Sequence, residues 1–149
     1  MAREQDVSLQ IAPIVRRFAA FVVDALFLIV SFLAAGSTLV ELGVDVPSVF
    51  ALMVAGHALY YIGFTVYWSS TPGKMAAGLY VSDQAGAAIR PDTAILRYLA
   101  SFVVGITIIG PSISALMLVT DRQHRAIHDR VAKTLVLVGR PAYEEARWR

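Results

Sequence analysis

Three long apolar stretches constrain this chain more than any other feature of its sequence. They cover residues 18–35, 47–68 and 98–120, and a helix needs about 20 apolar residues to cross a bilayer. Hydrophobic residues make up 57% of the chain and charged residues only 16%, against about 45–50% and about 25% in soluble domains. The pattern predicts an all-α integral membrane protein. It excludes a disordered chain, a coiled coil and a soluble nucleic-acid-binding protein, so we expect the lipid bilayer and no nucleic acid as partner.

Lysine and arginine are distributed unevenly among the segments that flank these stretches. The connection at 36–46 contains neither, whereas the first 17 residues, residues 69–97 and residues 121–149 are basic. Because short cytoplasmic loops are rich in Lys and Arg, we expect residues 36–46 outside and both termini in the cytoplasm. Termini on one side require an even number of crossings, although there are three apolar stretches.

A proline inside the third stretch offers one solution. Gly110 and Pro111 interrupt residues 98–120, and proline breaks a helix at or before its own position. We favour a re-entrant or interfacial helical hairpin that turns near Gly110-Pro111 and returns to the side it came from. The alternative is a third span kinked at Pro111, which would place the C-terminus outside.

Two short β-rich runs flank the third stretch. Residues 78–83 (GLYVSD) and 134–138 (TLVLV) have the composition of strands, and a lone strand would leave its backbone groups unpaired. We therefore expect them to pair as a small cytoplasmic two-stranded ribbon. Residues 121–133 are polar and compatible with a helix. These elements predict a single membrane domain over residues 1–141, followed by a soluble tail at 142–149.

Asp24 lies inside the first apolar stretch, where a carboxylate costs about 2.5–3.5 kcal/mol on insertion scales. Arg17 precedes it by two helical turns and shares its face. Two interpretations remain open: Asp24 pairs with a basic residue elsewhere in the fold, or it belongs to an ion or proton pathway. His57, midway along the second stretch, is typical of an interhelical hydrogen bond. If it faced Asp24, the two could relay protons.

A dense polar group follows the third stretch. His124 and His128 are four residues apart, but the zinc motif H-E-x-x-H requires a glutamate where Arg125 stands. Asp121 and Asp129 are each four residues from Arg125, so a solvated helix face with ion pairs is the simpler interpretation. We expect no metal and no cofactor. The chain has no cysteine and no nucleophile–base pair, so we do not expect an enzyme.

Four segments of the sequence, in this order, resemble the RDD family of membrane proteins. The resemblance covers roughly residues 14–138. The segments are residues 16–24 (RRFAAFVVD), residues 71–74 (TPGK) with 78–83 (GLYVSD), Arg97, and residues 128–136 (HDRVAKTLV).

The family is named for an arginine at the start of the first helix and two aspartates, the first within that helix. By this match Arg17 is the arginine and Asp24 the first aspartate. Asp129 is our choice for the second, with Asp83 as the alternative. Lys133 departs from the family pattern, because members often have glycine before the threonine.

The resemblance implies a small protein of the bacterial plasma (inner) membrane. Transport of unidentified ligands has been suggested for the family, and some members are associated with sodium/proton antiport. We therefore expect a transporter or cation/proton antiporter component that works as a homo-oligomer or with other membrane subunits. The alternative is a non-catalytic accessory or assembly subunit of a larger membrane complex. Candidate pathway or polar-network residues are Arg17, Asp24, Asp129 and His57, followed by Lys74, Asp83, Arg97 and His128.

Overall fold

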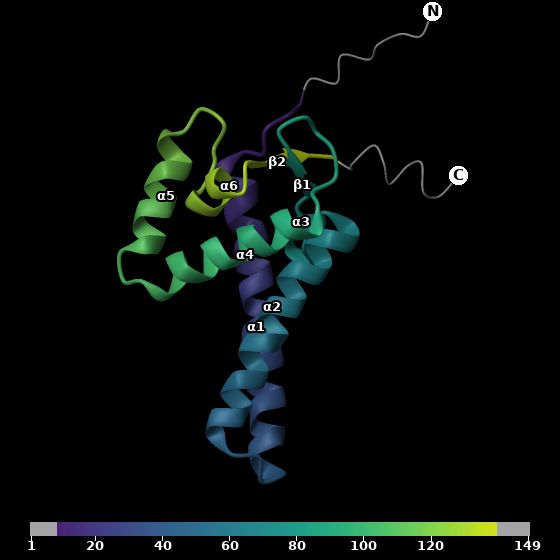
Figure 1. Ribbon diagram of the computed structural model, residues 1–149, viewed down its shortest axis with the longest axis vertical. Helices are drawn as coiled ribbons and strands as arrows, with labels where there is room; N and C mark the ends of the chain where they lie inside the picture. The colour runs from purple at the N-terminus through teal and green to yellow at the C-terminus, as the bar shows by residue number, and fades with distance from the viewer. Residues whose placement is uncertain (1–8, 140–149) are drawn as a thin grey trace, which may run out of the picture.

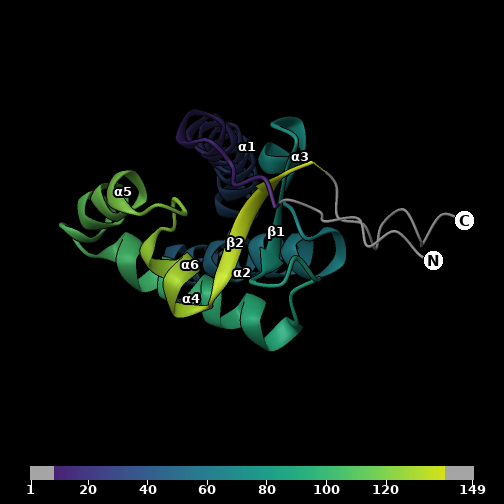
Figure 2. The same cartoon turned by 90° about the horizontal axis from the view of Figure 1, so that it is seen from above.

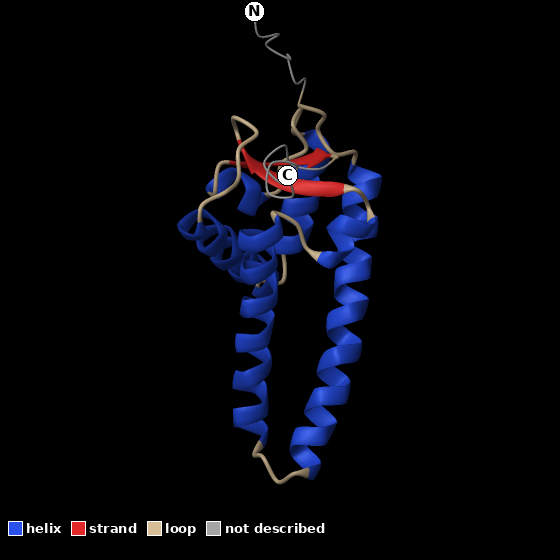
Figure 3. Cartoon of the chain, turned by 90° about the vertical axis from the view of Figure 1, so that its right-hand side faces the viewer, coloured by secondary structure: helices blue, strands red, loops and turns tan. Residues whose placement is uncertain are grey.

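A computed structural model of the chain, which describes residues 9–139, consists of a long helical hairpin with a compact head at one end (Figures 1 and 3). The hairpin contains α1 (Ile14–Glu41) and α2 (Val46–Trp68). Both are long and apolar enough to cross a membrane, which confirms the two predicted spans. Each helix extends beyond the apolar stretch that predicts it, and α1 does so by several residues at both ends.

The turn between the two long helices is built from local sequence signals. Gly43 adopts a positive φ of 84°, a conformation that glycine reaches without steric cost. Asp45 caps α2 by accepting a hydrogen bond from the Ser48 amide at 3.0 Å. Pro47 occupies the first turn of α2, where its missing N–H removes no helical hydrogen bond.

The head contains short helices and a two-stranded antiparallel sheet. Its elements are α3 (Pro72–Ala76), β1 (Leu79–Asp83), α6 (Ile127–Val131) and β2 (Thr134–Val138), and the helices α4 (Pro91–Ile106) and α5 (Gly110–Thr120) connect β1 to α6. The strands pair from Leu79–Val138 to Asp83–Thr134, so the predicted ribbon is confirmed. Ile11 bridges to Leu137 on the other side of β2. The first and last described residues therefore lie at the same end of the hairpin.

The apolar core of the head lies on one face of the ribbon. Leu79, Val81 and Val136 pack there with Ala20 of α1 and Ala94 of α4. All five are almost completely buried. The ribbon therefore holds the start of α1 and the start of α4 together, and it positions the polar residues that these helices carry.

The third apolar stretch is broken where the sequence predicts. α4 and α5 form a pair bent by 120°, with the break at residues 107–109 and Pro111 in the first turn of α5. α4 begins at Pro91, seven residues before the apolar stretch. Because β1 precedes the pair, β2 follows it and the strands are paired, the bent pair leaves the head and returns to it (Figure 1).

The prediction of a helix at residues 121–133 is wrong for the first half of that segment. Only Ile127–Val131 is helical, and His124 has a positive φ of 48°, so His124 and His128 do not share a helix face. Arg125 pairs with Asp121 as expected, at 3.0 Å, but it makes no ion pair with Asp129. The backbone around His124 is not helical, because the Asp121 carboxylate binds both the amide and the guanidinium of Arg125. The predicted tail at 142–149 lies outside the described residues.

Candidate functional site

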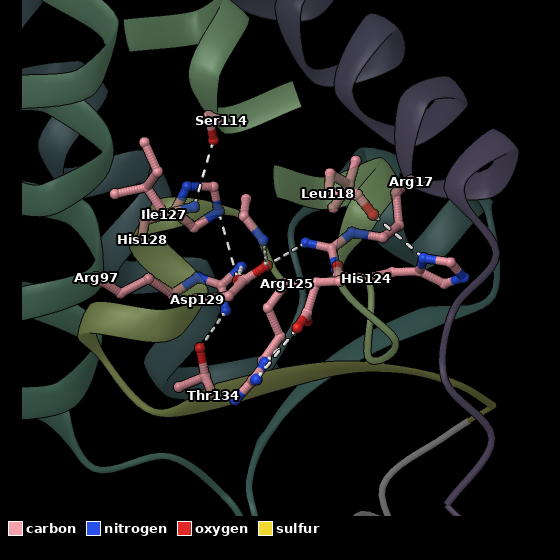
Figure 4. A network of polar contacts seen from close by, with 12 residues as sticks. Arg17, Arg97, Ser114, Leu118, His124, Arg125, Ile127, His128, Asp129 and Thr134 are labelled. Carbon is pink, nitrogen blue, oxygen red and sulfur yellow. Dashed lines mark hydrogen bonds and ion pairs between the residues drawn. The ribbon is translucent and has the colours of Figure 1, made fainter. Parts of the chain in front are cut away.

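A cluster of charged side chains lies where the head meets α1, and Figure 4 shows the part of it around Asp129. We call it the polar cluster. It contains residues from four helices, and its members are Arg17, Asp24, Lys74, Arg97, His128 and Asp129. The sequence places them in segments far apart, and the fold of the head brings them together.

Asp129 lies at the centre of one half of the polar cluster and is fully buried. Its Oδ2 pairs with Arg17, and its Oδ1 lies 2.7 Å from Arg97 Nη2 and 3.4 Å from His128 Nε2. Its Oδ2 also accepts a hydrogen bond from the Ala126 amide at the start of α6. Burial raises the pKa of Asp129, but the neighbouring positive charges outweigh burial and hold the pKa below its usual value. Asp129 is therefore an ionised carboxylate shared between two arginines.

Both arginines also bind groups beyond Asp129. Arg17 of α1 donates a hydrogen bond to the backbone carbonyl of His124, the residue with the positive φ. Arg97 of α4 donates to the hydroxyl of Thr134, the first residue of β2, at 2.8 Å. The two guanidinium groups thus connect α1, α4, α6 and β2 through a single buried anion.

Asp24 lies at the centre of the other half of the polar cluster and is also buried. It accepts hydrogen bonds from the Tyr60 hydroxyl at 2.6 Å, from the Thr71 hydroxyl, and from the Gly73 amide at 2.8 Å. Thr71 is the N-cap residue of α3 but makes no side-chain cap of its own. The carboxylate of Asp24 therefore caps α3 from a different helix, where a negative charge is favoured.

The basic partner that one interpretation expected for Asp24 is not found. Within residues 9–139, no lysine, arginine or histidine nitrogen lies at ion-pair distance from its carboxylate. Arg17 lies on the same helix but extends toward Asp129 instead. The three donors from α2 and α3 satisfy Asp24 without a cation, and this explains how an acid is accommodated within α1.

Gly73 allows α3 to approach α1 this closely. A Cβ atom at this position would lie 2.3 Å from the Ala20 carbonyl oxygen and 2.8 Å from the Asp24 Cγ. No side chain fits into that space, so only glycine lets its amide reach the Asp24 carboxylate.

Lys74 lies between the two halves of the polar cluster. Its Nζ donates to the Thr71 hydroxyl at 3.3 Å, and the same hydroxyl donates to Asp24. Burial, aided by the positive charge of Arg97, lowers the pKa of Lys74 to about 8. Desolvation disfavours the charged form of an amine, so this ammonium loses its proton much closer to neutral pH than an exposed lysine does.

Two of the predicted site residues lie outside the polar cluster. His57 Nδ1 lies 3.1 Å from the Tyr98 hydroxyl, an interhelical hydrogen bond between α2 and α4, and it does not contact Asp24. Asp83 accepts hydrogen bonds from two backbone amides in the turn that follows β1. Asp83 therefore stabilises that turn, whereas Asp129 is the aspartate that pairs with Arg17.

Sequence reasoning missed four residues of this site. Tyr60, Thr71 and Gly73 bind Asp24, and Thr134 binds Arg97. Thr-Pro-Gly indicates the start of a helix, but nothing in it shows that an aspartate on another helix provides the cap. Within residues 9–139, no three histidine or acidic side chains come together where they could hold a metal ion.

Two span-length apolar helices, a bent helix pair and a head fastened by buried charges define a small helical membrane protein. The profile of the RDD family matches residues 11–133, most of the chain, so the chain belongs to the RDD family. No curated protein and no solved structure matches it.

Proposed function

We propose that this RDD protein is a component of a membrane transport assembly that moves protons in exchange for a cation. The observation that carries the proposal is a directional hydrogen-bond chain inside the polar cluster. Lys74 donates to Thr71, and Thr71 donates to Asp24. When Asp24 takes the hydroxyl proton of Thr71 and Thr71 takes a proton from Lys74, one proton passes from the ammonium to the carboxylate.

The charges around this chain support proton exchange at Lys74. Three basic residues, Arg17, Lys74 and Arg97, stand against two acids, Asp24 and Asp129. Both arginines remain charged at any accessible pH, whereas the pKa of Lys74 is lowered to about 8. Loss of the Lys74 proton removes the excess positive charge, so Lys74 is the group in this cluster suited to exchange protons near neutral pH.

A transport pathway through the bilayer needs more than one copy of this chain or additional membrane subunits. Two long helices cannot surround a pathway by themselves, and most of their side chains face outward. We place the head and both termini in the cytoplasm of a bacterial cell, because residues 1–17, 69–97 and 121–149 are basic and residues 36–46 contain no lysine or arginine.

Proton flux in proteoliposomes tests the proposal. Purified chain is reconstituted with a pH-sensitive dye inside the vesicles, and a sodium or potassium gradient is imposed. We expect cation-dependent proton movement that falls about tenfold or more in Lys74→Met and in Asp24→Asn. Lys133→Gln, which removes an exposed lysine outside the cluster, is the matched control and keeps the flux of the wild type.

The two parts of this proposal fail separately. Absence of flux in the wild-type chain argues against transport itself. Wild-type flux that Lys74→Met leaves unchanged removes the relay but keeps the transport function.

A second candidate function is that of a non-catalytic accessory or assembly subunit. The observation in its favour is that Asp24 and Asp129 bind donors from within the chain, as structural groups do. Purification in a mild detergent should then recover other membrane proteins in fixed stoichiometry. A monodisperse homo-oligomer without other subunits would count against this function.

A further inference from the structure

The bent pair of α4 and α5 lies in an unusual position relative to the spans. α4 runs crosswise to α1 and α2, as two perpendicular views show (Figures 1 and 2). It crosses α2 where Tyr98 meets His57, midway along that helix. α4 therefore lies at a level that the spanning hairpin passes through, and not above the end of the hairpin.

One face of α4 is apolar and exposed, and the other side of the helix packs against the head through Ala94 and Arg97. Leu96, Leu99, Val103 and Ile106 follow each other at helical spacing and are 46–67% exposed. Arg97 points the other way and binds Asp129 in the head. An amphipathic helix of this kind is typical of a helix that lies along a membrane with its apolar face in the lipid.

The apolar surface continues through the break into α5. Ile108, at the break, is 97% exposed, and Ile109 and Leu116 are 66% and 63% exposed. Thr107 at the break closes the last turn of α4, because both its amide and its hydroxyl donate to the Val104 carbonyl. Water would be a poor environment for so continuous an apolar surface.

A groove of about 500 Å³ opens between α4 and α2. Phe50, Ala51 and Ala55 of α2 line one wall, and Leu99 and Phe102 of α4 line the other. Phe50, which lines the groove, is 68% exposed, so the groove opens onto the outward surface of α2, a helix apolar and long enough to span the bilayer. Its lining and its level fit the acyl chain of a lipid.

We infer that the α4–α5 pair is embedded in the head-side leaflet of the bilayer without crossing it. Lipid acyl chains cover the apolar face of α4 and fill the groove against α2. The charged residues Arg90 and Asp92 at the start of α4 are exposed and face water, whereas the exposed side chains of Ile108 and Ile109 at the break insert at the boundary between headgroups and acyl chains. This arrangement does not depend on any transport activity.

Single-cysteine scanning of the full chain in proteoliposomes tests this placement directly, because the chain has no cysteine. Ile108→Cys probes the break, Gln84→Cys marks the head side and Leu42→Cys marks the far end of the hairpin. With a membrane-impermeant maleimide applied to either side, we expect Ile108→Cys to react at least roughly tenfold more slowly than the marker on that side. Detergent should restore its reaction. A fluorophore on Ile108→Cys should be quenched by lipids that carry a spin label on the acyl chain.

Three results would overturn the inference. Reaction of Ile108→Cys from the side of Leu42→Cys would mean that the pair crosses the bilayer as a kinked span. Rapid reaction from the side of Gln84→Cys would place the break in water. Protection without quenching by labelled lipids would mean that protein, such as a second copy of the chain, covers the surface.

Discussion

The long hairpin and the head differ in what holds them together. The hairpin exposes most of its large apolar side chains, such as Phe21, Val30 and Leu33. The head buries nearly all of its strand residues and the polar cluster. The bilayer therefore determines the structure of the hairpin, whereas specific contacts determine the structure of the head, and the polar cluster fastens one to the other.

Removing the negative charge of Asp129 between Arg17 and Arg97 should cause the largest loss of stability, because it acts where the head is joined to the hairpin. Asp129→Asn leaves Arg17 and Arg97 buried without a negative partner, and breaking a buried pair in this way costs about 3–5 kcal/mol. Thermal unfolding of the chain in detergent micelles measures the loss. The control is Asp92→Asn, which disrupts the exposed Arg90–Asp92 pair and should leave the free energy of unfolding almost unchanged, because water screens a surface ion pair. Equal effects of the two substitutions would mean that the cluster does not fasten the head.

The close approach of α3 to α1 provides the next test. Gly73→Ala places a Cβ 2.3 Å from the Ala20 carbonyl oxygen and should destabilise the chain by about 1–3 kcal/mol through overpacking. Gly63→Ala is the matched control, because nothing lies within 4 Å of a Cβ there. Alanine is also the better helix former, so Gly63→Ala should be neutral or stabilising by up to about 1 kcal/mol. The same melting assay distinguishes the two variants, and a neutral Gly73→Ala would refute the tight contact.

Acid should weaken the head through His128. Burial lowers the pKa of His128 to about 4 from its usual value of 6.5, so the folded chain keeps this imidazole neutral. The unfolded chain binds this proton near pH 6.5. The free energy of unfolding therefore decreases as the pH falls from 6.5 toward 4. We expect the wild type to lose about 2 kcal/mol at most between pH 7.5 and pH 5.

His128→Gln isolates this contribution and should reduce the loss between pH 7.5 and pH 5. Asp129 does not interfere in this window, because its pKa is held below its usual value of 3.8 and its contribution is lost only at lower pH. A pH dependence that is identical in the wild type and in His128→Gln would assign the acid sensitivity to other groups.

The smallest expected effect is a gain in stability at Lys133. This residue has a positive φ of 52° between α6 and β2, a conformation that costs a non-glycine residue about 1–2 kcal/mol. Lys133→Gly should therefore stabilise the chain by up to about 1 kcal/mol, reduced by the greater freedom of glycine in the unfolded chain. Lys133→Ala, which keeps a Cβ, should bring no such gain, and the difference between the two melting temperatures measures the strain.

The sequence predicts local features well. Apolar length identifies both spans, β-rich composition identifies the ribbon, and Pro111 identifies the break in the third stretch. The start of α4 at Pro91 was missed because its first turn is polar and lies outside the apolar stretch. The non-helical course around His124 was missed because it depends on hydrogen bonds to Asp121 and Arg17, and the latter is more than 100 positions away in sequence.

The candidate site is predicted in part for the same reason. Asp24 stands out as an acid inside an apolar stretch with Arg17 on the same helix face, and the family resemblance adds Asp129. The pairing of Asp129 with Arg97 and the capping of α3 by Asp24 come only from the way the head packs on α1. Residue types can reveal that a buried acid needs partners, but only the tertiary fold shows which partners it has.

A double-mutant cycle between Arg17 and Asp129 tests most directly the claim that the polar cluster fastens the head to the hairpin. The free energy of unfolding is measured in detergent for the wild type, Arg17→Met, Asp129→Asn and the double variant. We predict that the double variant loses less stability than the sum of the single variants, with a coupling energy of about 1–3 kcal/mol. Losses that add without coupling would contradict the account, because Arg17 would then stabilise α1 independently of the head.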